Sequence, residues 1–168
     1  ERHERRDPLP RLRPIPAMKA RIRIAQGRLD EGNAWAARAK LTPDDDLSYL
    51  REFEHVTLAR VLIARHGSPV GERSLHDASR LLERLRPAAQ SGGRIGSVIE
   101  ILVLQSLAQQ TLGNTRSALD HLAESLALAE PEAFLRVFMD LCTRVRDLLR
   151  HATARGRAPS TIVTRPSP

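Results

Sequence analysis

The chain has 168 residues, of which 41% are hydrophobic, 28% are charged and only 3% are aromatic. This composition is typical of a globular protein, and so few aromatic side chains favour a core of packed helices over a β-sandwich. The formal net charge of +7 comes from the ends, since residues 1–23 and 142–168 each carry +5 and the middle carries −3. A nucleic-acid-binding body would instead be basic on its folded face, so we expect no direct binding of nucleic acid.

The first predicted unit is a helical hairpin preceded by a linker. The stretch "DPLPRLRPIP" has four prolines, so residues 1–16 are expected to form an extended arm or linker. A helix is predicted from Ala17 to Gly27, where the glycine suits the position just after a helix end. The segment "RLDEGNAWAARAK" then places Leu29, Gly32, Trp35 and Ala36 at three- and four-residue spacing, which predicts a second helix.

The second predicted hairpin has longer helices. A break in helical structure is predicted at "LTPDDD", and a helix from Leu47 to His66 is expected to follow it. The acids Asp44–Asp46 suit the first turn of that helix, and Leu50 is expected on its apolar side. The segment "GSPVGER" is predicted to be a loop. A helix from Leu75 to Gln90 follows, in which Pro87 should kink or fray the end.

The third predicted hairpin begins with the most apolar segment of the chain. Residues Gly96–Thr111 have the length of a helix and are apolar around most of its surface, so this helix should be central. Gly113 is expected to end it, and Asn114 or Thr115 to cap a helix that runs to about Glu130. A last helix is predicted over Phe134–Arg150, and residues 152–168 are expected to form a flexible tail.

Small residues recur at fixed distances from the turn glycines. Gly27 is followed five residues later by Gly32, and Gly113 is followed five residues later by Ala118. Small side chains let two antiparallel helices approach closely, and the recurrence resembles a degenerate tetratricopeptide repeat. The expected fold is therefore all-α, with antiparallel helical hairpins stacked as a TPR-like superhelix over residues 17–151. A closed antiparallel bundle is the alternative.

Several blocks together resemble one family. The segments "RIAQGRLDEGNAWA", "GRIGSVIEILVLQSLAQQ", "AEPEAFLRVFMD" and "LLRHATARGRAPSTIV" look like consecutive blocks from the repeat region of large ATP-binding transcriptional regulators of the LuxR type, in their maltose-activator-like group. The similarity covers about Ala17 to Val163. It implies a bacterial signal-transduction protein in which a P-loop ATPase precedes a helical-repeat sensor and a helix-turn-helix domain follows it. This chain contains neither of those flanking motifs.

The end of the chain leaves a second interpretation open. The family usually continues beyond the "ARGRAP" block into another leucine-rich turn, whereas here "STIVTRPSP" follows. Some bacterial Ser/Thr protein kinases carry the same regulator-like region as a tail, so a kinase regulatory tail is the alternative. Because Glu1 is not a natural start residue, we expect the chain to be a piece of a longer protein.

The repeat register predicts a binding groove on the concave face. The first helix of each hairpin lines that face in stacked repeats. Arg21 and Arg60 take matching places in the register, and Glu100 and Gln110 lie on the corresponding face of the third hairpin. Two arginines at one radial position suit an anionic ligand, although they could equally be ordinary solvated side chains. Trp35, the only tryptophan, could stack on a ligand or close the packing between hairpins.

The sequence shows no arrangement of residues suited to catalysis or to binding a metal ion. Its six histidines are scattered without metal-ligand spacing, and no acid, base and nucleophile cluster together, so we expect neither an enzyme, a metal site nor a cofactor. Cys142 is the only cysteine, which excludes an internal disulfide and favours the cytoplasm. The apolar run Ile95–Leu107 is too short and too interrupted to cross a membrane.

These expectations together describe a sensor and interaction module. Its predicted partners are a small effector or a protein or peptide in the groove, and the attached domains of the parent chain. A second copy of the chain is a further candidate partner. Such a module would act by biasing the activity of its attached domains, which requires two states that differ in affinity for the effector.

Overall fold

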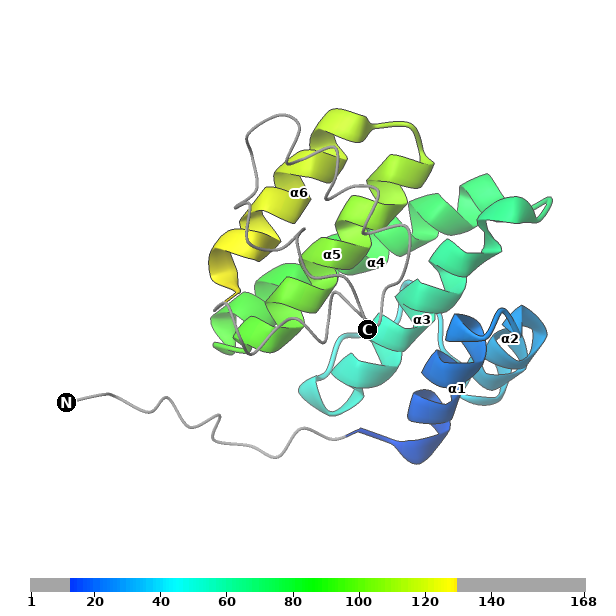
Figure 1. Cartoon of the computed structure of the whole chain (residues 1–168). Helices are drawn as coiled ribbons and strands as arrows, with labels where there is room; N and C mark the ends of the chain where they lie inside the picture. Colours follow the sequence, from blue (N-terminus) through cyan, green and yellow to red (C-terminus); the bar gives the residue numbers. More distant parts are fainter. Residues whose placement is uncertain (1–12, 130–168) are drawn as a thin grey trace, which may run out of the picture.

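The computed structural model describes residues 13–129 of the chain. Within this range the fold is all-α, as predicted, and its helices form three successive antiparallel hairpins (Figure 1). The first hairpin consists of α1 (Ile15–Ala25) and α2 (Leu29–Arg38). The predicted helix over Phe134–Arg150, the tail, Cys142 and most of the predicted linker lie outside the described residues.

The second and third hairpins complete the stack. A 3-10 helix, η1 (Tyr49–Arg51), leads into α3 (Glu52–Ala64), and a second, η2 (Arg65–Gly67), leads to α4 (Gly71–Ser91). The third hairpin is α5 (Ile95–Thr111) and α6 (Thr115–Leu128). None of these described helices is both long and apolar enough to cross a membrane.

The three turn glycines adopt the backbone conformation that their positions require. Gly27, Gly93 and Gly113 all have positive φ values, between 66° and 84°. This left-handed region is costly for a residue with a Cβ atom, so glycine reverses the chain here with little strain. The prediction of glycine turns after Ala25 and Thr111 is therefore confirmed. Asn114 occupies the N-cap position of α6, but its side-chain amide donates to Oε1 of Gln109 and does not cap the helix.

Helix α4 starts earlier and runs further than the sequence predicted. It begins at Gly71, so part of the expected loop "GSPVGER" is helical, and it continues past Pro87 to Ser91. Gly71 is needed for close packing, because a Cβ atom there would lie 2.4 Å from the carbonyl oxygen of His66. The proline and glycines in this segment allow a tight turn into the helix and do not delay its start.

The predicted start of the second hairpin was also wrong in detail. Asp44–Asp46 lie in the loop before η1, and the acidic residues in the first turn of α3 are Glu52 and Glu54. Thr42 explains the difference, since its backbone N–H donates to Asp45 and holds a local turn. Leu50, expected on the apolar side, is 60% exposed because it falls in η1 and not in the longer helix.

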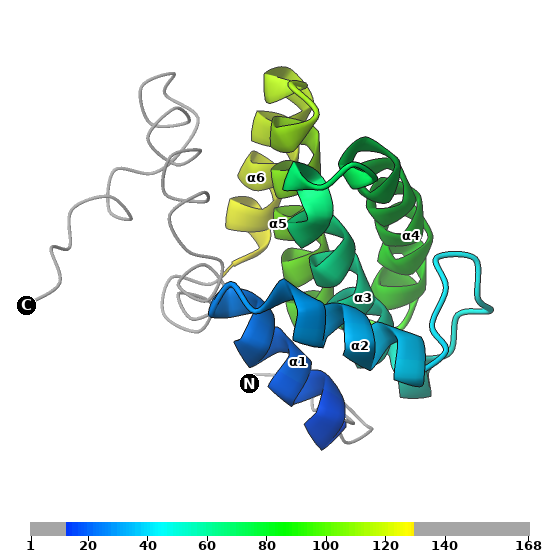
Figure 2. The ribbon, with the colours of Figure 1, turned by 90° about the vertical axis from the view of Figure 1, so that its right-hand side faces the viewer.

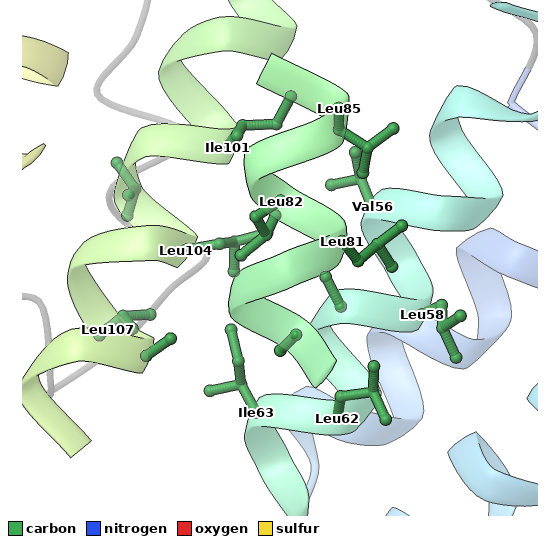
Figure 3. Packing of buried hydrophobic residues seen from close by; sticks show 14 of the residues in the cluster. Val56, Leu58, Leu62, Ile63, Leu81, Leu82, Leu85, Ile101, Leu104 and Leu107 are labelled. Carbon is green, nitrogen blue, oxygen red and sulfur yellow. The ribbon is translucent and has the colours of Figure 1, made fainter. Parts of the chain in front are cut away.

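The core lies between the helices of successive hairpins. Helix α4 packs against both α3 and α5, and Figure 3 shows Leu82 of α4 beside Leu104 of α5, with Leu81 and Leu85 toward Val56 of α3. Every residue of α5 from Ile101 to Ala108 is buried, which confirms its predicted central position. The small residues of the register are buried as well: Ala20, Gly32, Ala59, Ala78, Ser106 and Ala118.

The helices fall into an inner and an outer row. The first helices of the hairpins pack in succession, α1 on α3 and α3 on α5, whereas α2, α4 and α6 scarcely contact one another. Figure 2 shows α4 and α6 on different sides of α5. Hairpins that touch along their first helices and diverge along their second helices curve toward the first-helix face, as in a helical-repeat superhelix.

Candidate functional site

Three of the predicted groove residues meet in one cluster, which we call the Arg–Glu–Arg cluster. Arg21 comes from α1, Arg60 from α3 and Glu100 from α5. Nη1 of Arg21 and Nη2 of Arg60 each lie 2.8 Å from the same carboxylate oxygen, Oε1 of Glu100. Arg60 also donates to that oxygen from Nε at 3.0 Å. One residue from each helix of the inner row therefore contributes to the cluster.

Further contacts of Arg21 hold it in place. Its Nε donates to Oγ1 of Thr57 at 2.8 Å, and its guanidinium carbon lies 3.7 Å from the centre of the Phe53 ring. A guanidinium over an aromatic face is stabilised by the ring quadrupole. Arg13 approaches the same ring at 6.0 Å, so two cations lie near Phe53.

The cluster is partly buried but not sealed from solvent. The side chains of Arg21, Arg60 and Glu100 are 18%, 14% and 17% exposed. Burial lowers the pKa of Arg21 to about 10; Arg60 and Arg13 act in the same direction, and the charge of Glu100 opposes them. Arg21 therefore remains a cation at neutral pH.

Glu100 is ionised in this setting. Burial acts to raise the pKa of Glu100, but the charges of Arg60 and Arg21 outweigh it, so the pKa lies below the ordinary value for glutamate. One carboxylate faces two guanidinium groups, and Arg13 adds a third positive charge nearby. The cluster consequently has an excess of positive charge that a further anion could balance.

The other two predicted groove residues do not join the cluster. Gln110 is exposed and lies ten residues beyond Glu100, about 15 Å along α5 and about 80° around it. Trp35 is 5% exposed and lies on α2, in the outer row. It lines a hollow of about 700 Å³ between α1 and α2, together with Ala20 and Ala39. This position fits the packing interpretation of Trp35 better than a place in the groove.

Two residues that contact the Arg–Glu–Arg cluster were not among the predicted groove residues. Phe53 and Thr57 both contact Arg21, and with Arg60 they follow an i, i+4, i+7 spacing along α3. This spacing places all three on one face of a helix, so the signal was present in the sequence. No cluster of three or more His, Cys, Asp or Glu side chains within residues 13–129 could hold a metal ion.

The comparisons with known proteins place the chain in a family. A family model described as the MalT-like TPR region matches residues 1–155. Neither the search of curated proteins nor that of solved structures finds a match. The family match agrees with the resemblance seen in the sequence blocks and with the three stacked hairpins.

Proposed function

The chain belongs to the MalT-like TPR region family, and we propose that it is the non-catalytic sensor region of a LuxR-type regulator. Its ligand would be an acidic segment of a protein partner, which binds across the Arg–Glu–Arg cluster. The observation that carries the proposal is the convergence of Arg21 and Arg60 on one carboxylate, Glu100.

The charge of the cluster selects the chemistry of the partner. Each guanidinium group has five N–H donors and a geometry suited to carboxylates. A single glutamate cannot neutralise two such groups, so an incoming carboxylate would gain charge-assisted hydrogen bonds. The side chains of Arg21 and Arg60 are partly exposed, so an incoming carboxylate side chain can reach them.

The shape of the surface favours an extended partner over a small effector. Small-molecule sites are usually enclosed concavities that bury most of the ligand. Neither the hollow lined by Trp35 nor a second hollow near His121 includes a residue of the cluster. The inner row of helices instead offers a continuous face from α1 to α5, which suits a peptide segment.

Binding of a ligand at the Arg–Glu–Arg cluster would affect the stacking of the three hairpins. Glu100 joins α5 to both α1 and α3, so it links all three hairpins. A carboxylate that competes with Glu100 for the arginines would weaken this link and change the preferred stacking of the hairpins. A ligand that binds one stacking arrangement more tightly shifts the equilibrium toward it, and attached domains could respond to that shift.

The proposal is tested by peptide binding to the full chain. A fluorescently labelled peptide of alternating Glu and Gly would be titrated and followed by anisotropy, with its Gln–Gly counterpart as the uncharged control. We expect Arg60→Ala to weaken binding about tenfold, because it removes charge-assisted hydrogen bonds. Arg73→Ala removes an exposed arginine of α4 and should change little. Equal losses in the two variants, or equal affinity for the two peptides, would contradict the proposal. The kinase-tail alternative stays a prediction, since no observation on the described residues favours it.

A further inference from the structure

A hollow of about 700 Å³ runs along the first hairpin, between α1 and α2 and next to the first turn of α3. Binding sites for small molecules usually have volumes of about 300–1,000 Å³ and mainly apolar walls. Six of the lining residues are apolar: Ile15, Pro16, Ala20, Ala34, Trp35 and Ala39. In size and in lining, the hollow therefore resembles a small-molecule site.

The sequence creates this space by placing small side chains on both walls. Ala20 on one wall and Ala34 and Ala39 on the other leave room that longer side chains would fill. Trp35 is 5% exposed, whereas Ile15, at the start of α1, is 67% exposed. An apolar ligand body in the hollow would remove Ile15 and Ala34, which are both exposed, from water, and this favours binding.

Both carboxylates of the lining are already paired with arginines. Oε2 of Glu31 lies 2.7 Å from Nη1 of Arg23, which is itself a lining residue. Oε2 of Glu54 accepts a hydrogen bond of 3.1 Å from Nε of Arg51, which lies outside the lining. The negative charge of the hollow is therefore neutralised by neighbouring arginines.

Two cations of the lining remain unpaired. Lys19 of α1 and Arg38, the last residue of α2, are exposed and form no ion pair within residues 13–129. They come from the two helices that form opposite walls of the hollow. The lining consequently combines an excess of positive charge with an apolar surface, and this combination selects an anion that has an apolar body.

We propose that this hollow binds a small amphipathic anion, in which a carboxylate is attached to an apolar chain or ring. The apolar body would lie against Ile15, Ala34 and Trp35, and the carboxylate would pair with Lys19 and Arg38. Burial of the apolar body supplies most of the affinity and the two cations select the charge, because ion pairs with exposed side chains are weak. The inference is independent of the proposed function, since the hollow shares no residue with the Arg–Glu–Arg cluster.

Octanoate, octylammonium and acetate separate the contributions of the apolar body and of the charge. Each would be titrated into the full chain and followed by the fluorescence of Trp35, which is the only tryptophan. We expect a saturable change in emission with octanoate alone, because octylammonium has the same body with the opposite charge and acetate has the charge without the body. Saturation by acetate, or by octylammonium at an affinity similar to that of octanoate, would overturn the proposal.

A substitution that fills the hollow tests whether octanoate binds there. Ala34→Phe should raise the dissociation constant for octanoate about tenfold, because the ring takes the place of the apolar body. Ala37→Phe, at an exposed position of the same helix outside the lining, is the matched control and should leave it unchanged. Calorimetry would measure binding to both variants, since Ala34 adjoins Trp35 and its replacement alters the emission directly. Equal affinity of the two variants would overturn the proposal.

A second pair of variants tests the selection of charge. Lys19→Gln combined with Arg38→Gln should raise the dissociation constant for octanoate about tenfold, whereas Arg73→Gln combined with Arg116→Gln removes two exposed arginines elsewhere and should change little. Because Lys19 and Arg38 are exposed, their replacement keeps the test open even if a variant that fills the hollow folds poorly. Equal affinity of the two double variants would overturn the proposal. Emission that depends on protein concentration without any probe would overturn it as well, because a second copy of the chain would then cover the hollow.

Discussion

Arg21 and Glu100 form an ion pair, with Nη1 of the arginine 2.8 Å from Oε1 of the glutamate, that joins the first hairpin directly to the third. Helices α1 and α5 are separated by α3 along the inner row, and Arg60 of α3 binds the same oxygen. The stacking of the three hairpins therefore depends partly on one carboxylate, in addition to the apolar core.

Replacing Glu100 by Gln should destabilise the protein. Arg21 and Arg60 would then face each other without a balancing charge in a setting that is less than one-fifth exposed. Breaking a buried pair costs about 3–5 kcal/mol and an exposed pair under about 1 kcal/mol, so we expect an intermediate loss of about 2 kcal/mol. Urea denaturation would measure the free energy of unfolding. The control Glu72→Gln, at an exposed site, should change the free energy of unfolding by less than about 0.5 kcal/mol. An equally small change for Glu100→Gln would show that the ion pairs of Glu100 do not stabilise the fold.

The contribution of Glu100 should disappear in acid. Its pKa is lowered in the folded state, so the folded protein binds this proton less tightly than the unfolded chain. The stabilisation is complete above the ordinary glutamate pKa of about 4.3 and is lost as the pH falls through the lower folded value. The difference in unfolding free energy between the parent and Glu100→Gln should thus be constant near neutral pH and shrink below pH of about 4. Asp45, whose pKa is lowered by Thr42, contributes equally to both proteins and cancels. A difference that grew in acid would contradict this assignment.

The sequence predicted the framework because backbone and packing rules are local. Turn glycines such as Gly113 and small residues such as Ala118 are fixed by φ angles and by helix spacing, and both were found where expected. The register also assigned Arg21, Arg60 and Glu100 to one face as candidate groove residues. It could not show that the three bind one another, because that depends on side-chain conformations and on the curvature of the stack. Gln110 lies outside the cluster because it is ten residues beyond Glu100 on the same helix, and its place in a binding groove stays a prediction.

The packing of α6 against α5 predicts that a larger side chain at Ala118 destabilises the protein. Ala118 of α6 is fully buried, and its carbonyl oxygen accepts a hydrogen bond of 2.7 Å from Ser106 of α5. A leucine at this position would force the two helices apart, with a loss of about 1–3 kcal/mol. Ala127→Leu, on the exposed side of the same helix, should change the free energy of unfolding by less than about 0.5 kcal/mol. Thermal or urea unfolding would measure the stability of both variants. Equal stability of the leucine variants at Ala118 and Ala127 would argue against close packing of α6 on α5.

A second charged link connects the start of α3 to α5. Glu52 is buried, receives a hydrogen bond of 2.8 Å from Nε of Arg94 and another of 2.6 Å from Oγ of Ser97. Arg94→Ala would leave this carboxylate with only the serine as partner, at a cost of about 2–3 kcal/mol. Arg116→Ala, which removes an exposed arginine of α6, is the matched control. Arg94→Ala should unfold at a clearly lower urea concentration than Arg116→Ala. Equal midpoints would show that the fold tolerates a buried Glu52 carboxylate without its arginine partner.

If Arg21 and Arg60 bind an acidic partner in competition with Glu100, then removing the carboxylate of Glu100 changes the affinity of that partner. The affinity of the Glu–Gly peptide would be compared between the parent chain and Glu100→Gln at a temperature where both are folded. Removing the competing carboxylate should tighten peptide binding severalfold, even though the same change lowers stability. Weaker or unchanged binding in Glu100→Gln would mean that the Arg–Glu–Arg cluster only links the hairpins and is not a binding site.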